Sequence, residues 1–365
     1  MASYPKWASE MSEIFKSGSI SQFLLYGNID DWVTYAGEGN QALQCLSLKD
    51  FLTRIMFAPF EVVLTYDRGH GIRASKGGEL FFNFLKAYDS FHRTGFATSA
   101  GGDITADSAN SLPKEPKKAL ALIDRFIRHG LVRMTSDKSG KAVANPMRIA
   151  VIIDYAQYLL PRAEIAYTSA ESVETLIRVL DWASDPNINS AYVSTCLIAE
   201  NLNDVNRQLV ENPRSAKIQI SLPDSETVLN FVQAITSSIA DFATICDVDR
   251  ASLAQKLEGL SCIDVQNLIE RAIKNNRRIS MEYLREVKKE MIEKSAGGRI
   301  VFVESTRNLD DVAGHTEAKA WLRQDASLMK RGKIKALPMG YLITGRIGTG
   351  KTYLVECFAG EAGVP

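Results

Sequence analysis

The sequence has 365 residues, of which 45% are hydrophobic, and its 43 basic residues balance 43 acidic ones. A chain of this length and composition can bury the cores of two or three globular domains. Because it carries no net charge, it lacks the overall field that would attract nucleic acid or an anionic membrane. We therefore expect neither a membrane nor a nucleic acid as partner.

Cysteine usage and the first residues indicate the compartment. The five cysteines form no C-x-x-C pair and their number is odd, which is typical of free thiols in a reducing compartment. The start, Met1-Ala-Ser-Tyr-Pro-Lys-Trp7, lacks the apolar core of a signal peptide, and no apolar run is long enough to cross a bilayer. The four histidines show no metal-binding spacing. These features predict a cytoplasmic protein.

Residues 1–224 show the alternation of an α/β domain. After an amphipathic helix within residues 1–20, apolar runs predict strands, and the segments between them predict helices or crossover connections. The predicted strands cover residues 22–26, 61–67, 147–154, 192–199 and 216–222. The predicted helices cover residues 47–56, 86–91, 119–129 and 168–182, and a surface loop is expected at 97–116. This alternation specifies a parallel sheet.

Two strand ends in this domain are places where a nucleotide could bind. The first strand ends in Gly27-Asn-Ile-Asp-Asp31, but a second glycine, a lysine and a correctly placed Ser or Thr are missing. The run from Met147 closes on Asp154, where the metal of a nucleotide would be held, yet Tyr155 follows where a hydrolysing ATPase usually has Glu. Asp154 can equally be an N-cap or a structural acid. The first strand end therefore lacks the means to hold a phosphate.

From Asp224 the pattern becomes helical. Helices are predicted at 225–241, 250–258, 262–277 and 280–294, and a helical bundle after an α/β core suggests a lid. Ala296-Gly-Gly298 ends the bundle, and Ile300–Glu304 begins the linker into a second unit. We predict three parts, which are an α/β module at 1–224, a helical lid at 225–298 and the N-terminal part of a second module at 299–365.

The most specific motif is Gly345-Arg-Ile-Gly-Thr-Gly-Lys-Thr352. It follows the apolar run Gly340–Thr344, which predicts a strand, and it precedes a predicted helix at Tyr353–Ala359. Glycines let the backbone curl so that its N–H groups face a polyphosphate. Lys351 then reaches the β- and γ-phosphates, and the Thr352 hydroxyl is placed to ligate Mg²⁺. The motif predicts a site for ATP and Mg²⁺.

The order of these motifs resembles a tandem AAA+ ATPase with a degenerate first module and the beginning of a conventional second one. Upstream of the glycine loop, the segment from Asn308 to Leu322, which includes Asp-Asp-Val-Ala-Gly, is similar to the one that borders the adenine in this family. The implied fold class is α/β, a P-loop NTPase-like parallel sheet with helices on both faces plus a helical lid, followed by the start of a second AAA+ module. In the first module, the missing phosphate loop and Tyr155 imply a role in assembly, regulation or substrate docking.

The resemblance also implies which residues form the nucleotide site. Asp311, Val312 and Ala313 would contact the base, and Gly314 would permit the close turn. Lys351 and Thr352 would have the catalytic roles, and Thr352 would also hold the metal. The complete set of expected binding residues is Asp311, Val312, Ala313, Gly314, Gly345, Gly348, Thr349, Gly350, Lys351, Thr352 and Tyr353.

The expected function is ATP hydrolysis coupled to remodelling of a protein client in a homo-oligomeric, hexameric ring. Because the sequence stops at Pro365, we expect a truncated motor that binds ATP without turning it over, with its remaining acids further on. The alternative is a non-hydrolysing, nucleotide-gated scaffold or regulatory subunit, and the zero net charge disfavours a nucleic-acid translocase. A permuted domain in which Asp154 serves Lys351 would leave the helices at 225–294 without a place.

Overall fold

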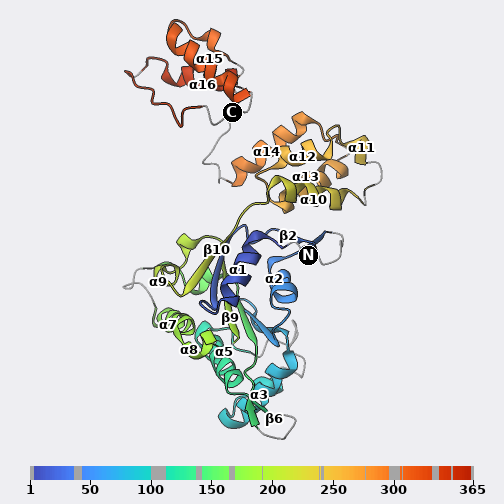
Figure 1. Cartoon of the computed structure of the whole chain (residues 1–365), viewed down its shortest axis with the longest axis vertical. Coiled ribbons are helices and arrows are strands. Elements are labelled where there is room, and N and C mark those ends of the chain that lie inside the picture. Colours follow the sequence, from blue (N-terminus) through green and yellow to red (C-terminus); the bar gives the residue numbers. More distant parts are fainter. Residues whose placement is uncertain are drawn as a thin grey trace. The chain divides into compact units, whose positions relative to one another are not determined.

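The computed structural model describes residues 4–362 except 37–42, 100–111, 137–141, 164–168, 191, 238, 240–241, 276, 296–304, 306, 331–336 and 347. The chain forms two compact units, Met1–Ser280 and Met281–Pro365 (Figure 1). The predicted linker at Ile300–Glu304 lies outside the described residues. The division of the chain into the parts 1–224, 225–298 and 299–365 stays a prediction.

The first unit is built on a six-stranded sheet with the strand order β10-β1-β9-β8-β4-β5 (Figure 1). Neighbouring strands pair in parallel, except that β5 pairs antiparallel with β4. The strands are β1 (Gln22–Gly27), β4 (Val62–Asp67), β5 (Gly71–Lys76), β8 (Ile149–Ile153), β9 (Val193–Ala199) and β10 (Ser215–Ile220). Strands β8 and β9 are buried along their whole length, as parallel strands with both faces covered are. The predicted α/β fold with a parallel sheet is confirmed.

Strand β5 is the part of this sheet that the sequence does not predict. The turn before it is held by Asp67, whose Oδ1 accepts hydrogen bonds from the backbone N–H groups of Gly69 at 2.9 Å and His70 at 2.7 Å. This turn sends the chain back along β4 instead of away from the sheet. Because β5 lies at the edge and ends in exposed polar residues, its apolar pattern is too short to stand out.

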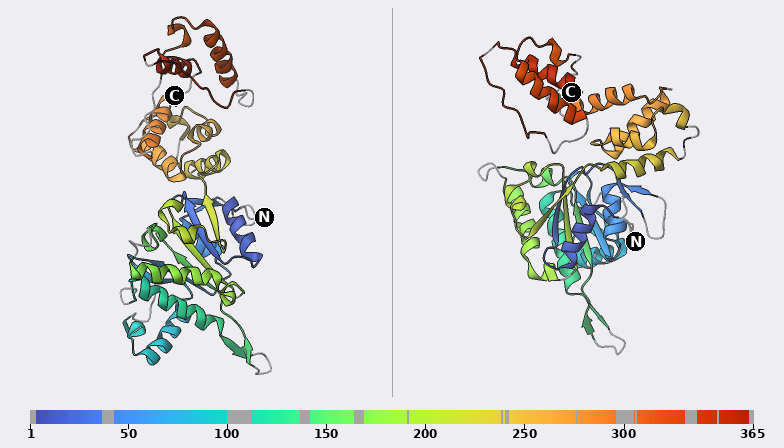
Figure 2. Two further views of the ribbon diagram at one scale, coloured as in Figure 1. Left: turned by 90° about the vertical axis from the view of Figure 1, so that its left-hand side faces the viewer. Right: turned by 45° about the horizontal axis from the view of Figure 1, so that its top comes forward.

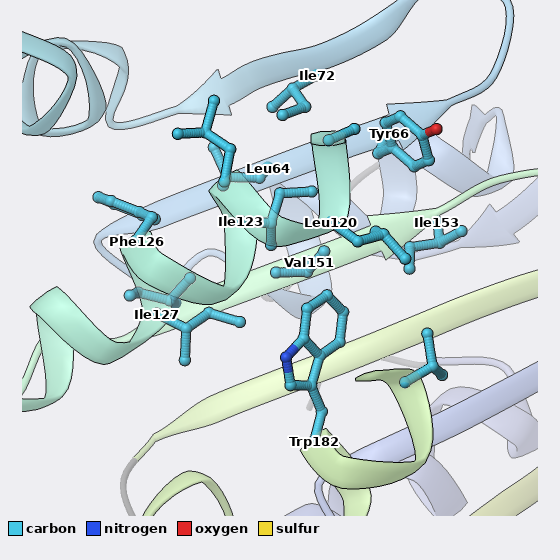
Figure 3. Packing of buried hydrophobic residues seen from close by; sticks show 14 of the residues in the cluster. Leu64, Tyr66, Ile72, Leu120, Ile123, Phe126, Ile127, Val151, Ile153 and Trp182 are labelled. Carbon is cyan, nitrogen blue, oxygen red and sulfur yellow. The ribbon is translucent and has the colours of Figure 1, made fainter. Parts of the chain in front are cut away.

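Helices cover both faces of the sheet (Figure 1). One face is covered by α3 (Gly78–His92), α5 (Pro116–Leu131) and α7 (Ala170–Ser184). The other face is covered by α1 (Lys6–Lys16) and α2 (Leu48–Phe51), which continues as the π-helical turn η1 (Leu52–Met56). The core on the first face contains Phe126 of α5 and Trp182 of α7 (Figure 3). Trp182 Nε1 also donates a hydrogen bond to Asp124 at 2.9 Å.

Shorter elements connect these layers. They are β2 (Val33–Tyr35), β3 (Gln44–Leu46), α4 (Phe96–Ser99), β6 (Met134–Ser136), β7 (Ala142–Ala144), α6 (Ala156–Leu159), α8 (Pro186–Ser190), η4 (Leu202–Asp204) and α9 (Arg207–Val210). Strands β6 and β7 pair in an antiparallel hairpin that projects from the sheet domain (Figure 2). The predicted surface loop at 97–116 is wrong at both ends, where α4 and α5 lie, and residues 100–111 are outside the described ones.

After the sheet, the first unit continues as a helical domain. Its helices are α10 (Ser225–Thr236), α11 (Phe242–Ile245), α12 (Arg250–Leu257) and α13 (Cys262–Lys274), and α10 contacts both α12 and α13. The side chains of Asp224, Asp249 and Ser261 accept hydrogen bonds from the first N–H groups of α10, α12 and α13. The predicted helical character of this region is therefore correct. Each of these three helices ends earlier than the sequence predicts.

The second unit contains α14 (Met281–Ser295), the 3₁₀ turn η5 (Leu309–Asp311), α15 (Thr316–Lys330) and α16 (Lys351–Ala362). Helix α16 contacts α15 and η5. The predicted strand at Gly340–Thr344 is wrong, because these residues have no regular secondary structure and Leu342 is 92% exposed. A strand needs a neighbour to pair with, and the described residues of this unit include no other strand. None of the described helices has the length and apolar character that crossing a bilayer requires.

The packing of α5 on the sheet can be tested at Phe126, whose side chain is fully buried. Phe126→Ala should lower the free energy of unfolding of the first unit by about 3–5 kcal/mol, because a cavity replaces the ring. Phe91→Ala is the matched control, since Phe91 is 85% exposed, and it should change the same quantity by less than about 0.5 kcal/mol. Denaturant unfolding followed by circular dichroism measures both, and equal effects would contradict the placement of α5.

Candidate nucleotide site

The glycine loop before α16 curls around Lys351. Gly348 and Gly350 have φ angles of +83° and +79°, in the left-handed region that favours glycine. Lys351 Nζ donates hydrogen bonds to the carbonyl oxygens of Gly345 at 3.0 Å and Arg346 at 2.7 Å. These carbonyls are neutral acceptors, so phosphate oxygens, which are charged acceptors, can replace them with stronger hydrogen bonds. The loop therefore places an ammonium group where a phosphate can reach it.

A side chain at Gly345 would crowd the glycine loop. A Cβ atom built on this residue would lie 3.2 Å from Thr349 Oγ1. Thr349 is itself held in the loop, because its hydroxyl donates to the carbonyl of Arg346 at 2.8 Å. The loop is therefore a cradle that a Cβ would partly fill, and its shape suits a polyphosphate that lies against backbone.

Helix α16 adds the partial positive charge of a helix N-terminus. The N–H group of Leu354 donates to the carbonyl of Gly350 at 2.9 Å, which is the first bond of the helical ladder. By helix geometry the N–H groups of Lys351, Thr352 and Tyr353 precede that bond and are the ones open to an anion. Thr352 is exposed, so its hydroxyl is accessible to a metal ion that arrives with phosphate.

The segment before α15 reaches the same end of α16. Tyr353 Oη donates to the carbonyl of Asp311 at 3.5 Å, and the Arg307 guanidinium lies 4.9 Å from the centre of the Tyr353 ring. Asn308 and Asp311 form a reciprocal capping box at η5, which fixes the backbone of this segment. The structure therefore brings Asp311 beside the first turn of α16, although the two are far apart in the sequence.

The other residues expected to border a base follow directly. Val312 is buried, and its carbonyl accepts a hydrogen bond from Lys319 Nζ at 2.7 Å. Ala313 and Gly314 are exposed, and Gly314 has a φ of +73°, where the chain turns into α15. The geometry leaves this backbone accessible to a ligand, while the base-binding roles of these residues stay predictions.

Gly360 lets the same segment pack closely against α16, a contact that the sequence analysis does not predict. A Cβ on Gly360 would overlap the carbonyl oxygen of Arg307 and lie 3.0 Å from that of Ser305. The backbone at Ser305 and Arg307 therefore crosses α16 at a distance that only glycine allows. An isolated glycine inside a helical pattern is the signal that could have identified this contact.

The corresponding position of the first unit holds an ion pair. Asp154 lies at the carboxyl end of β8, is 8% exposed, and pairs with Lys49 of α2. Partial burial opposes the charge of Lys49, but the hydrogen bond and the charge of Asp154 outweigh this effect and raise the pKa of the ammonium. The backbone N–H of Tyr155 donates to Asp154 at 2.9 Å, and Tyr155 has a φ of +53°. This environment favours the interpretation that Asp154 is a structural acid.

The described part of the chain offers few side-chain ligands for a divalent metal. Among the residues that the structure describes, no group of three or more His, Cys, Asp or Glu side chains could hold one. Mg²⁺ typically binds through one or two protein ligands together with substrate phosphates and water. The exposed Thr352 hydroxyl beside the glycine loop fits that mode of binding.

Known proteins resemble this chain along most of its length. Residues 1–221 match the family described as "AAA+ chaperone, N-terminal Rossmann-like domain", and residues 229–297 match "AAA+ chaperone, second helical domain". An uncharacterized AAA domain-containing protein, ycf46, of Guillardia theta is 25% identical over 242 residues, which cover 62% of this chain and 45% of that protein.

Shorter stretches resemble a protease family. The ATP-dependent zinc metalloprotease FtsH of Burkholderia pseudomallei is 45% identical over 75 residues, which cover 18% of this chain and 11% of that protein. FtsH of Syntrophobacter fumaroxidans is 48% identical over 67 residues, which cover 17% of this chain and 10% of that protein. The chain thus spans less than half the length of each of these relatives.

A double-mutant cycle tests the ion pair between Lys49 and Asp154. Lys49→Met should destabilise the wild-type chain by at least about 1 kcal/mol more than it destabilises the Asp154→Asn variant, because only the charged acid needs a counter-charge. Denaturant unfolding of the four proteins gives this coupling energy. A matched cycle on the exposed pair Arg207 and Glu211 should give less than about 0.5 kcal/mol. Additive effects at Lys49 and Asp154 would show that the two charges do not interact.

Because of the close approach at Gly360, replacing this glycine by alanine should destabilise the second unit, although the same replacement stabilises most helices. Alanine in a helix is normally more stable than glycine by about 1 kcal/mol. Gly360→Ala should nevertheless lower the melting temperature of the second unit, because the Cβ would push away the carbonyl of Arg307. Gly340→Ala is the control, since nothing lies within 4 Å of a Cβ there. Calorimetry measures the melting temperatures of both variants. A Gly360→Ala protein that melts at a higher temperature than the wild type would contradict the contact.

Proposed function

The chain belongs to the AAA+ chaperone family, and from this membership and the geometry of the glycine loop we propose that it binds ATP with Mg²⁺ at residues 345–353. The observation that carries the proposal is the position of Lys351. Its ammonium lies inside the loop, on the carbonyls of Gly345 and Arg346, at the N-terminus of a helix. A lysine, a backbone cradle and a helix N-terminus together are the features that bind a polyphosphate.

Each residue of this loop has a distinct role in the proposal. Lys351 binds the β- and γ-phosphates, and the backbone at Gly345, Gly348, Thr349 and Gly350 surrounds them. Thr352 supplies a hydroxyl to Mg²⁺, which when bound neutralises charge on the phosphates. On the other side, Asp311, Val312, Ala313 and Gly314 border the base beside Tyr353, consistent with the contact between Tyr353 and Asp311.

For the whole protein we propose ATP hydrolysis coupled to remodelling of a protein client. The family is one of AAA+ chaperones, which supports ATPase activity of the chaperone type. We further propose a homo-oligomeric, hexameric ring in a cytoplasmic setting, in which the first module serves assembly or docking. We propose that residues 1–365 by themselves bind ATP without turning it over, because the glycine loop at residues 345–352 contains no acid that could orient the attacking water.

The second candidate is a nucleotide-gated scaffold that does not hydrolyse ATP. The observation that favours it is the ion pair between Lys49 and Asp154, which engages the acid that would otherwise hold a metal in the first module. If one module functions without nucleotide chemistry, ATP at the other can order an oligomer without turnover. Phosphate release by the assembled oligomer separates the candidates, since only a motor releases phosphate over many cycles.

Titration calorimetry with Mg²⁺-ATP tests the proposed site. Lys351→Ala should weaken binding on the order of a hundredfold or more, because charge-assisted hydrogen bonds to phosphate are lost. Thr352→Ala should weaken it only while Mg²⁺ is present. Lys49→Ala is the matched lysine control, since Lys49 also lies in the first turn of a helix, α2, and it should leave binding unchanged.

Two outcomes would contradict this proposal. Binding that survives Lys351→Ala and is lost in Lys49→Ala would place the nucleotide in the first module. Steady phosphate release by this chain alone, measured in parallel, would show that it turns ATP over without further residues.

A further inference from the structure

The loop after β1 carries a buried carboxylate with four hydrogen-bond donors. Asp31 is 6% exposed. Within its own loop it accepts from the side-chain amide of Asn28 and from the backbone N–H of Trp32, each at 2.8 Å. From the helical domain it accepts from the backbone N–H groups of Cys262 and Ile263, each at 2.9 Å. Each carboxylate oxygen of Asp31 therefore accepts one hydrogen bond from its own loop and one from the helical domain.

The helical partner of Asp31 is the N-terminus of α13. The first N–H groups of a helix have no intrahelical acceptor and carry partial positive charge. Ser261, the residue before the helix, accepts only the N–H of Asp264 at 3.0 Å. The two N–H groups before it, those of Cys262 and Ile263, are satisfied by a residue more than two hundred positions earlier in the chain. The sheet domain therefore supplies the hydrogen-bond acceptors for this end of α13.

A second contact fixes the helix about its own axis. Trp32 Nε1 donates to the side-chain oxygen of Gln266 at 3.0 Å, one turn along α13 from Cys262. Two attachment points one turn apart hold both the position and the rotation of a helix. Both points on the sheet domain come from adjacent residues, Asp31 and Trp32.

The loop that carries Asp31 is itself anchored to the carboxyl edge of the sheet. Gly27 has a φ of +99°, and a Cβ on it would lie 2.6 Å from the carbonyl oxygen of Ile220. The N–H of Gly27 donates to the carbonyl of Glu200 at 3.1 Å, and that of Asn28 donates to the carbonyl of Ile220 at 2.9 Å. The loop is thus bound to the ends of β9 and β10. It cannot move away from the sheet together with α13 without breaking these bonds.

We propose that Asp31 is a built-in anion that takes the place of a nucleotide phosphate between the sheet domain and the helical domain of the first unit, which together are called the first module from here on. The carboxyl end of a parallel sheet, beside its first strand, is where a phosphate binds in nucleotide-binding α/β folds. Here the anion at that edge is covalently part of the chain and is always present. The first module therefore keeps one arrangement of its two domains with or without ATP, whatever binds at residues 345–353.

Amide hydrogen exchange read by mass spectrometry tests this proposal on the full chain. In Asp31→Ala, the peptides that contain Cys262 and Ile263 should exchange on the order of tenfold faster or more, because their charge-assisted acceptor is lost. The strands β8 and β9 should keep their protection. Asp30→Ala is the matched control, since Asp30 is the exposed neighbour of Asp31, and it should leave exchange at α13 unchanged. Unchanged exchange in Asp31→Ala would overturn the proposal.

A second arm tests the independence from nucleotide. In the Lys351→Ala background, ATP with Mg²⁺ should leave exchange at Cys262 and Ile263 as it is without nucleotide. Slower exchange on addition of ATP would show that nucleotide itself binds between the domains, which would overturn the proposal. If Asp31→Ala also speeds amide exchange in β8 and β9, the Asp31→Asn variant replaces it in the test. The amide keeps one acceptor oxygen, so faster exchange confined to α13 supports the contact, and exchange equal to the wild type overturns it.

Discussion

The free N–H groups at the start of a helix need hydrogen-bond acceptors. The two units of this chain differ in what supplies these acceptors. In the first unit, the carboxylate of Asp31 supplies the acceptor for α13. In the second unit, α16 is preceded by Gly350, which has no side chain to serve as a cap. One helix N-terminus is therefore closed by the chain itself, whereas the other is open to an anion from outside.

The same contrast applies to the positive charges near these helices. Lys49 lies in the first turn of α2 and forms an ion pair with Asp154, an acid that is 8% exposed. Lys351 lies in the first turn of α16, and its acceptors among the described residues are the neutral carbonyls of Gly345 and Arg346. Phosphate oxygens would compete with an acid at Lys49 but only with carbonyls at Lys351. If nucleotide binds at residues 345–353 and not in the first module, as we propose, this difference in charge compensation is one physical reason.

The sequence predicted the sheet because its central strands are buried on both faces and are therefore long apolar runs. It missed β5, where an edge strand mixes polar and apolar residues and depends on the turn that Asp67 makes. It assigned a strand at Gly340–Thr344 from apolar character alone, although a strand also needs a partner. The glycine loop was recognisable because its spacing is local. Asp31 was not, because its partners on α13 are brought to it only by the fold.

Together, the proposed ATP site and the proposed role of Asp31 would limit where ATP can act in the chain. A ligand shifts a conformational equilibrium only by the difference between its affinities for the two states. If Asp31 holds the sheet domain and the helical domain together at all times, nucleotide has no second arrangement of the first module to select. Any change that depends on ATP must then begin at residues 345–353, where the acceptors of Lys351 can be exchanged for phosphate. The first module would then follow such a change as a rigid body, which suits the role in assembly or docking that we propose for it.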